Sequence, residues 1–326
     1  MTQDALSRRD ILRFVGAAGA AVLLPTSLFA QRGQDGKPLK SPVPSFDVDP
    51  IKVEEIGHNL FLISGIGGNI TLKRSSDGGL MVDSGVPTRA KELIRMAQKI
   101  NGGRVATLVN THHHFDHTGG NEEFGLAHAR IIAQAGVRPR LSSDQVIELI
   151  NLKVPASPKA ALPTLSFTES LRIELEDTGV HLRSVEPAHT DNDLFVVYES
   201  ENLIQTGDLF FNGVYPLIDF SSGGWIGGMV AGIDAVIRHS DEKTRIVPGH
   251  GGIGKVEDAK VYREMLATIH QRIEGLLGEG KTLEQVVAAK PSADFDAHWG
   301  HGLFNGDAFV SMATTGILRH KAAKGS

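Results

Sequence analysis

Short runs of apolar residues in the first half of the chain predict β-strands. Residues 51–56 alternate apolar and polar side chains, the period of a strand with one covered face. Other short apolar runs bounded by turn residues predict further strands at 59–63, 69–74, 80–83, 105–110 and 130–133. The glycine-rich segment 65–69 lies between two of these strands, and we expect it to form a mobile hairpin.

Helices are expected between these strands. Apolar residues at helical spacing predict a helix over 88–100, which ends before Gly102 and Gly103. We also expect a short helix at 121–127 and a longer one at 143–152, capped by Ser142 or Ser143. Three prolines in 154–163 predict a loop.

The second half repeats this order of strands followed by helices. Strands are predicted at 165–167, 171–175, 180–185, 194–198, 202–205 and 244–247. Helices are predicted at 225–238, 256–277 and 283–289. Two such halves favour an α+β fold of the αββα sandwich type, in which two mixed β-sheets pack face to face with helices on both outer sides.

The chain divides into three parts by composition. Residues 1–30 resemble a twin-arginine signal peptide, with Arg8 and Arg9 before an apolar run at 14–24 that is too short to span a bilayer. Residues 31–50 are rich in Gly, Pro and Lys and are expected to form a linker or arm. Residues 51–326 are expected to form a single catalytic domain with a C-terminal helical extension. We therefore expect a periplasmic or otherwise exported protein without a stable membrane anchor.

The net charge and the cysteine content limit which partners and which metal ligands are expected. The 326 residues carry a formal net charge of −5, which disfavours nucleic acid as a partner and leaves a small-molecule substrate as the expectation. The sequence leaves the oligomeric state open. The chain contains no cysteine, so it forms no disulfide, and a metal would have to be held by histidine and carboxylate side chains.

Histidines and aspartates cluster directly after the strand at 105–110. In the stretch 111–120, residues two apart in extended backbone point the same way, so His112 and His114 can converge on one cation. Asp116 and His117 follow and can turn toward a second cation. Three more candidate ligands lie at the ends of later predicted strands: His189, Asp208 and His250. We expect His113 to point away from the metals.

These motifs resemble the metallo-β-lactamase superfamily over about residues 51–251. The resemblance implies one metal held by His112, His114 and His189, a second held by Asp116, His117 and His250, and Asp208 between them. It also implies two zinc ions, with iron or manganese as alternatives, and a shared water that becomes hydroxide near pH ~7 and attacks a carbonyl. Asp116 is the candidate catalytic residue. Asp83 and Asp193 are candidates for fixing histidine tautomers through hydrogen bonds.

The resemblance implies a hydrolase of small molecules that cleaves an ester, lactone, thioester or amide bond. Branches with a cysteine at the bridging position place a lysine three residues later, but Phe211 stands there in this chain. Cleavage of β-lactams is therefore expected at most as a weak side activity. The ligand pattern also leaves room for an iron-dependent persulfide dioxygenase or a non-catalytic metal-binding protein. The expected lining of the substrate pocket is Ile66, Phe211 and Tyr215.

Overall fold

The computed structural model describes residues 50–325 of the chain. These residues belong to one structural unit, Pro42–Ser326. The expected signal peptide and nearly all of the expected linker lie outside the described residues. Within the part that is described, no helix has the length and apolar character needed to cross a membrane.

The first sheet has seven strands in the order β1-β2-β3-β4-β5-β6-β9. Strands β1 to β4 pair antiparallel, whereas β4, β5, β6 and β9 run parallel. The strands are β1 Lys52–Gly57, β2 Leu60–Ser64, β3 Ile70–Lys73, β4 Gly79–Val82, β5 Val105–Asn110, β6 Arg130–Gln134 and β9 Leu165–Phe167.

The second sheet has six strands in the order β10-β11-β12-β13-β14-β15. They are β10 Ser170–Glu174, β11 Gly179–Ser184, β12 Leu194–Tyr198, β13 Leu203–Gln205, β14 Arg245–Val247 and β15 Gly254–Lys255. The two sheets pack face to face, because Val82 and Val109 of the first sheet share one buried cluster with Leu182 and Val196 of the second.

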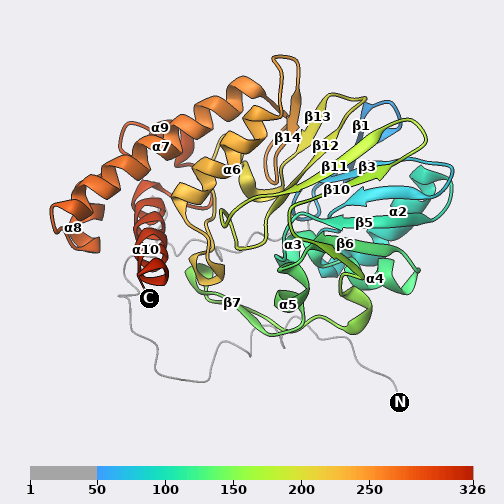
Figure 1. Cartoon of the computed structure of the whole chain (residues 1–326), viewed down its shortest axis with the longest axis horizontal. Helices are drawn as coiled ribbons and strands as arrows, with labels where there is room; N and C mark the ends of the chain where they lie inside the picture. Colours follow the sequence, from blue (N-terminus) through green and yellow to red (C-terminus); the bar gives the residue numbers. More distant parts are fainter. Residues whose placement is uncertain (1–49, 326) are drawn as a thin grey trace. The chain divides into compact units, whose positions relative to one another are not determined.

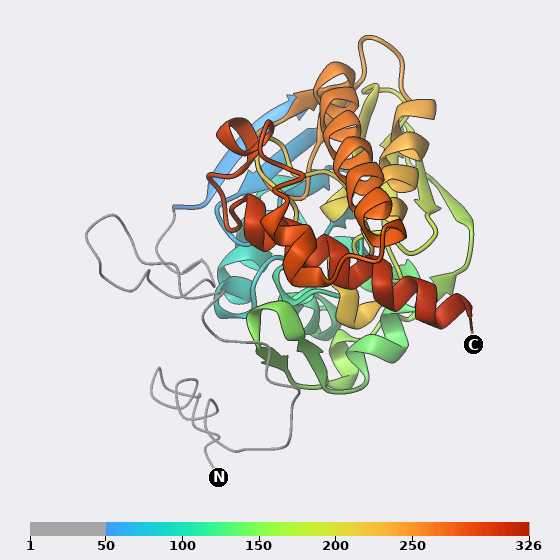
Figure 2. The same ribbon diagram turned by 90° about the vertical axis from the view of Figure 1, so that its left-hand side faces the viewer.

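Helices cover the outer face of each sheet (Figure 1). On the first sheet, α2 inserts Leu93 and Ala97 among buried strand residues. On the second sheet, α6 and α7 cover a buried cluster, and α10 crosses α7 farther out (Figure 2). The helices are α2 Ala90–Asn101, α3 Phe115–Thr118, α4 Asn121–Leu126, α5 Val137–Leu141, α6 Ile226–Arg238, α7 Val256–Gly278, α8 Leu283–Ala288, α9 Asp296–Trp299 and α10 Gly306–Lys324. The expected αββα sandwich is confirmed.

Short 3₁₀ turns and a separate hairpin connect these layers. The turns are η2 Pro87–Arg89, η3 Glu148–Ile150, η4 Lys159–Ala161, η5 Gly207–Leu209 and η6 Phe220–Ser222. The hairpin pairs β7 Gln145–Ile147 antiparallel with β8 Leu152–Val154 and belongs to neither large sheet.

The helix expected at residues 143–152 is wrong, because these residues form the β7–β8 hairpin. Ile147 is buried between exposed or half-buried neighbours, which is the alternation of a strand. After the turn η3, Asn151 adopts a φ of 50°, a left-handed conformation that asparagine tolerates better than most residues. This turn reverses the chain where an α-helix would have continued.

Candidate metal centre

Seven candidate ligands meet at one edge of the sandwich. The His-rich stretch follows β5, Asp208 and His250 follow the neighbouring parallel strands β13 and β14, and His189 lies in the loop before β12. Loops at the carboxyl ends of strands commonly form ligand sites in sheets of this kind. The candidate ligand atoms form two groups, each within 4.8 Å: His112, His114, His189 and Asp208 in the first group, and Asp116, His117 and His250 in the second group.

The first group is built around three imidazole rings. His114 Nδ1 lies 2.9 Å from His189 Nε2, and Asp208 Oδ2 lies 3.4 Å from the same nitrogen of His189. The ring centroid of His112 lies 4.8 Å from that of His114 and 4.7 Å from that of His189. All four residues are buried. Three imidazoles with one carboxylate are a donor set that suits zinc.

The second group lies beside Asp208 of the first group. Asp116 Oδ2 lies 3.3 Å from His250 Nε2 and 3.7 Å from His117 Nε2. Asp208 Oδ1 lies 3.1 Å from His117 Nε2, although these two atoms lack hydrogen-bond geometry. Asp208 Oδ2 lies 3.5 Å from His250 Nε2. The Asp208 carboxylate therefore contacts histidines of both groups.

Several of these buried atoms lack a hydrogen-bond partner among the described residues. They are His112 Nε2, His117 Nε2 and Asp208 Oδ1. Buried polar atoms are normally satisfied, and cations held at the two groups would satisfy these three. Imidazole and carboxylate donors suit zinc, iron and manganese. The residues therefore fit the metal-binding role that the sequence predicted.

Burial and neighbouring charges shift the pKa values of the candidate histidine ligands. Burial lowers the pKa of His112 well below its usual range, so this imidazole is neutral at pH 7. Burial also opposes protonation of His250, but Asp208 and Asp116 outweigh it and raise the pKa of His250 to about 9. Asp208 and Asp116 likewise raise the pKa of His117 well above its usual range, against burial. A metal at the second group must therefore displace protons near neutral pH.

Asp83 and Asp193 hold different parts of the site. Asp83 Oδ2 lies 2.8 Å from His117 Nδ1, and the Asp83 carboxylate also accepts hydrogen bonds from the backbone N–H and the hydroxyl of Thr111. Asp83 adopts a φ of 66°, an uncommon conformation that these hydrogen bonds hold in place. The Asp193 carboxylate, by contrast, accepts hydrogen bonds from the backbone N–H and the hydroxyl of Thr190, and from no histidine among the described residues. Asp83 can therefore orient a candidate ligand directly, whereas Asp193 shapes the loop after His189.

The sequence model of the metallo-beta-lactamase superfamily matches residues 63–250, more than half of the chain. The chain belongs to the metallo-beta-lactamase superfamily. The matched segment includes every candidate ligand, from His112 to His250. Its αββα fold, with the ligands at one edge, agrees with this membership.

The chain is similar in sequence to a protein from Methanocaldococcus jannaschii that is named as a probable metallo-hydrolase. It is 27% identical over 182 residues, which are 54% of this chain and 84% of the relative. A metallo-beta-lactamase from Pontibacter korlensis has a TM-score of 0.56 and 14% identity, covering 67% of this chain and 99% of that chain. A sec-alkylsulfatase from Pseudomonas sp. has a TM-score of 0.61 and 15% identity, covering 85% of this chain and 52% of that chain. The two solved structures support the fold alone.

Asp219 is a residue of the site that the sequence pattern did not reveal. Its Oδ2 lies 3.1 Å from His114 Nε2, and its backbone N–H donates to the carbonyl of His189. Asp219 lies 105 positions after His114, outside every motif, and the only local signal is its capping of the turn η6. His113 lies within hydrogen-bond distance of Asn192 and outside the two groups just described, although its ligand atom lies within 4.8 Å of those of His114 and Asp219.

A pocket of about 200 Å³ opens onto both groups of ligands. Phe211 lines it and stacks on His250 with ring centroids 5.2 Å apart. Tyr215 also lines it, but its hydroxyl donates to Asp296 Oδ1 at 2.8 Å and is therefore already occupied. The sequence did not predict the contribution of Leu303 and Phe304, which reach the pocket from the segment before α10.

The expected pocket role of Ile66 is wrong. Its side chain is fully buried in the core between α2 and the first sheet and does not line this pocket. The surrounding segment 65–69 is also not a free hairpin, because the N–H of Gly68 donates to the Asp116 carbonyl and the N–H of Asn69 donates to the Gly249 carbonyl. These bonds fix the segment against two candidate ligand loops.

Proposed function

We propose that the protein is an exported hydrolase that uses two zinc ions to cleave an ester, lactone, thioester or amide bond of a small neutral molecule. The observation that carries this proposal is the position of Asp208. Its Oδ1 lies toward His117 of the second group, and its Oδ2 lies toward His189 of the first group. A carboxylate in this position suits two cations that share a ligand.

In the proposed reaction, the cations and the protein side chains have different roles. When bound, two divalent cations would lower the pKa of a water molecule to near neutral and would also polarise the carbonyl under attack. Burial opposes ionisation of Asp116, but His117 and His250 hold the pKa of its carboxyl at about 2. Asp116 therefore lines the pocket as a carboxylate that can accept a hydrogen bond from the attacking water. Phe211 stacks on His250 and gives that side of the pocket an apolar wall.

The pocket lining supports a neutral substrate. Its polar side chains are the candidate metal ligands and the occupied hydroxyl of Tyr215, and neither lysine nor arginine is among the described residues that line it. The other walls are apolar, and they include Ile150, Leu217 and Phe304. A substrate carboxylate or sulfate would find no lysine or arginine there to pair with. We therefore expect neutral esters and lactones to be cleaved faster than cephalosporins or alkyl sulfates.

A substrate panel tests this function. Zinc-loaded protein should cleave lactones or aryl esters well above a His114→Ala control, because His114 belongs to the first group. If the protein cleaved none of these substrates above the control, the proposal would be contradicted. Native protein that contains iron and consumes oxygen with a persulfide would favour a dioxygenase. Inactivity on every substrate, with metal bound, would favour a non-catalytic metal-binding protein.

Export through the twin-arginine route is a separate part of the proposal. It is supported by Arg8 and Arg9 before the apolar run at 14–24. Fractionation of the native cells should find the mature protein outside the cytosol, with Gln31 as its N-terminus. Recovery of the protein only in the cytosol, with its N-terminus uncleaved, would contradict export but would leave the hydrolase proposal standing.

A further inference from the structure

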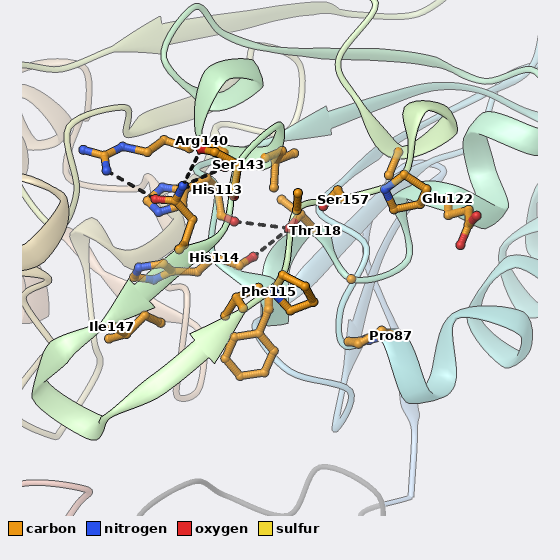
Figure 3. A pocket seen from close by; sticks show the side chains of 18 residues that line it. Pro87, His113, His114, Phe115, Thr118, Glu122, Arg140, Ser143, Ile147 and Ser157 are labelled. Carbon is orange, nitrogen blue, oxygen red and sulfur yellow. Dashed lines mark hydrogen bonds between the residues drawn. The ribbon is translucent and has the colours of Figure 1, made fainter. Parts of the chain in front are cut away.

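A second cavity of about 220 Å³ lies beside the candidate metal centre (Figure 3). Its walls come from the His-rich loop with α3, from the β7–β8 hairpin and from the proline-rich segment 155–158. Pro87 and Glu122 are exposed residues of its lining, so the cavity reaches the surface near them. Nothing in the proposed chemistry uses this cavity.

Three residues line both the second cavity and the pocket at the candidate metal centre. They are His114, Phe115 and Ile147. His114 belongs to the first group of ligands, while Phe115 and Ile147 are apolar and belong to separate elements, α3 and β7. The two spaces therefore adjoin at these side chains, and Phe115 and Ile147 form the apolar part of their common boundary.

Two of the polar side chains around the second cavity already have partners. Arg140 forms an ion pair with Asp191 and donates to Gln145 Oε1 at 3.2 Å. The hydroxyl of Thr118 donates to the carbonyls of His113 and His114 (Figure 3). Because these groups already have partners, a ligand gains most from the apolar walls. Those walls include Phe115, Leu141, Ile147, Val154 and Ala156.

We propose that the second cavity binds the apolar side group of the substrate, while the scissile bond lies at the candidate metal centre. This inference rests on the proposed hydrolase function and specifies its substrate class. By comparison with benzene, which fills a cavity of roughly 150 Å³, the space accommodates a ring or chain of about eight carbons. The substrate class is thus a neutral ester or lactone with an apolar group of this size.

Filling the cavity tests the proposal. Ala156 lines the cavity and is exposed, so Ala156→Phe adds bulk at the rim without opening the core. We expect this variant to lower kcat/KM for an octanoyl aryl ester by about tenfold or more, because several methylene groups lose their burial. Hydrolysis of the acetyl ester should stay within about twofold of wild type. Val146→Phe is the matched control, because Val146 is exposed on the same hairpin and lines neither space.

A smaller side chain at the boundary between the two spaces should have the opposite effect. Ile147→Ala removes apolar bulk between the two spaces and should raise the ratio of octanoyl to acetyl hydrolysis. Equal effects of Ala156→Phe on both esters, or none on either, would overturn the cavity assignment. So would a loss of octanoyl hydrolysis in Val146→Phe as large as that in Ala156→Phe.

A binding measurement separates this inference from the proposed function. The probe is 1-octanol, and the readout is the rise in Tm of the full-length, metal-loaded protein, because a ligand of the native state stabilises it. Wild type and Val146→Phe should show the same rise, and Ala156→Phe should show less than half of it. If wild type cleaves no ester but shows this pattern, the hydrolase proposal fails and the cavity stands as an apolar binding site. An unchanged rise in Ala156→Phe refutes the cavity assignment whatever the activity.

Discussion

Asp219 Oδ2 lies 3.1 Å from His114 Nε2, and the opposite nitrogen of His114, Nδ1, faces His189 at 2.9 Å. This arrangement assigns the two imidazole nitrogens of His114 to different partners. The Asp219 carboxylate is itself held by the hydroxyls of Ser221 and Ser222. Asp219 therefore orients His114 so that Nδ1 is presented to the first group of ligands.

Removing this carboxylate should weaken metal binding. In Asp219→Asn the neutral amide no longer stabilises His114, and we expect zinc affinity at the first group to fall by about 10–100-fold. Competition with a chromophoric chelator measures the affinity. Asp234→Asn is the control, because Asp234 forms a comparable aspartate contact with Arg263 between α6 and α7, away from the site. An affinity equal to wild type in Asp219→Asn would show that the hydrogen bond does not support the ligand.

Metal affinity at the second group should rise with pH. The pKa of His250 is raised to about 9 and that of His117 is also raised, so both are protonated in the metal-free protein at pH 7. Zinc must displace these protons, so affinity should rise by about tenfold per pH unit for each displaced proton as the pH approaches 9. Titration calorimetry in buffers of different ionisation enthalpy counts the released protons. Binding at the second group without proton release at pH 7 would contradict this assignment.

The sequence revealed the candidate ligands because the residues of each motif are local and follow strand ends. His112 and His114 are two positions apart, and the apolar run before them marks β5 clearly. Asp219 could not be found in this way, because its contact with His114 spans 105 positions and depends on how the two sheets are packed. Leu303 and Phe304 were missed for the same reason. The β7–β8 hairpin was mistaken for a helix because its apolar residues are too closely spaced to distinguish the two periods.

Gly68 is a position where a single methyl group should disturb the second group of ligands. A Cβ atom added to Gly68 would lie 2.1 Å from Cε1 of His117, closer than atoms can approach. We therefore expect Gly68→Ala to displace His117 and, for the two zinc ions that we propose, to lower the zinc content of the protein from two ions per chain toward one. Elemental analysis measures the stoichiometry. Gly103→Ala is the control, because a Cβ there meets no atom within 4 Å. Two tightly bound ions in Gly68→Ala would contradict the assignment of His117.

Lys73 should stabilise the fold independently of the metal. Its ammonium group is fully buried and donates to Glu201 at 2.6 Å and to Asp177 at 2.8 Å, which joins β3 of the first sheet to turns of the second sheet. Lys73→Met leaves the nearly buried Glu201 carboxylate without its cation. We therefore expect the free energy of unfolding to fall by about 3–5 kcal/mol.

Chemical denaturation after chelation of metal measures this loss, because bound zinc would otherwise add its own stabilisation. The double variant with Lys73→Met and Glu201→Leu should recover much of the stability, since it removes the unpaired charge together with its partner. Lys91→Met, at an exposed position on α2, should change the free energy of unfolding by less than about 0.5 kcal/mol. If Lys73→Met changed the free energy of unfolding as little as Lys91→Met does, the buried ion pair would contribute little to holding the two sheets together.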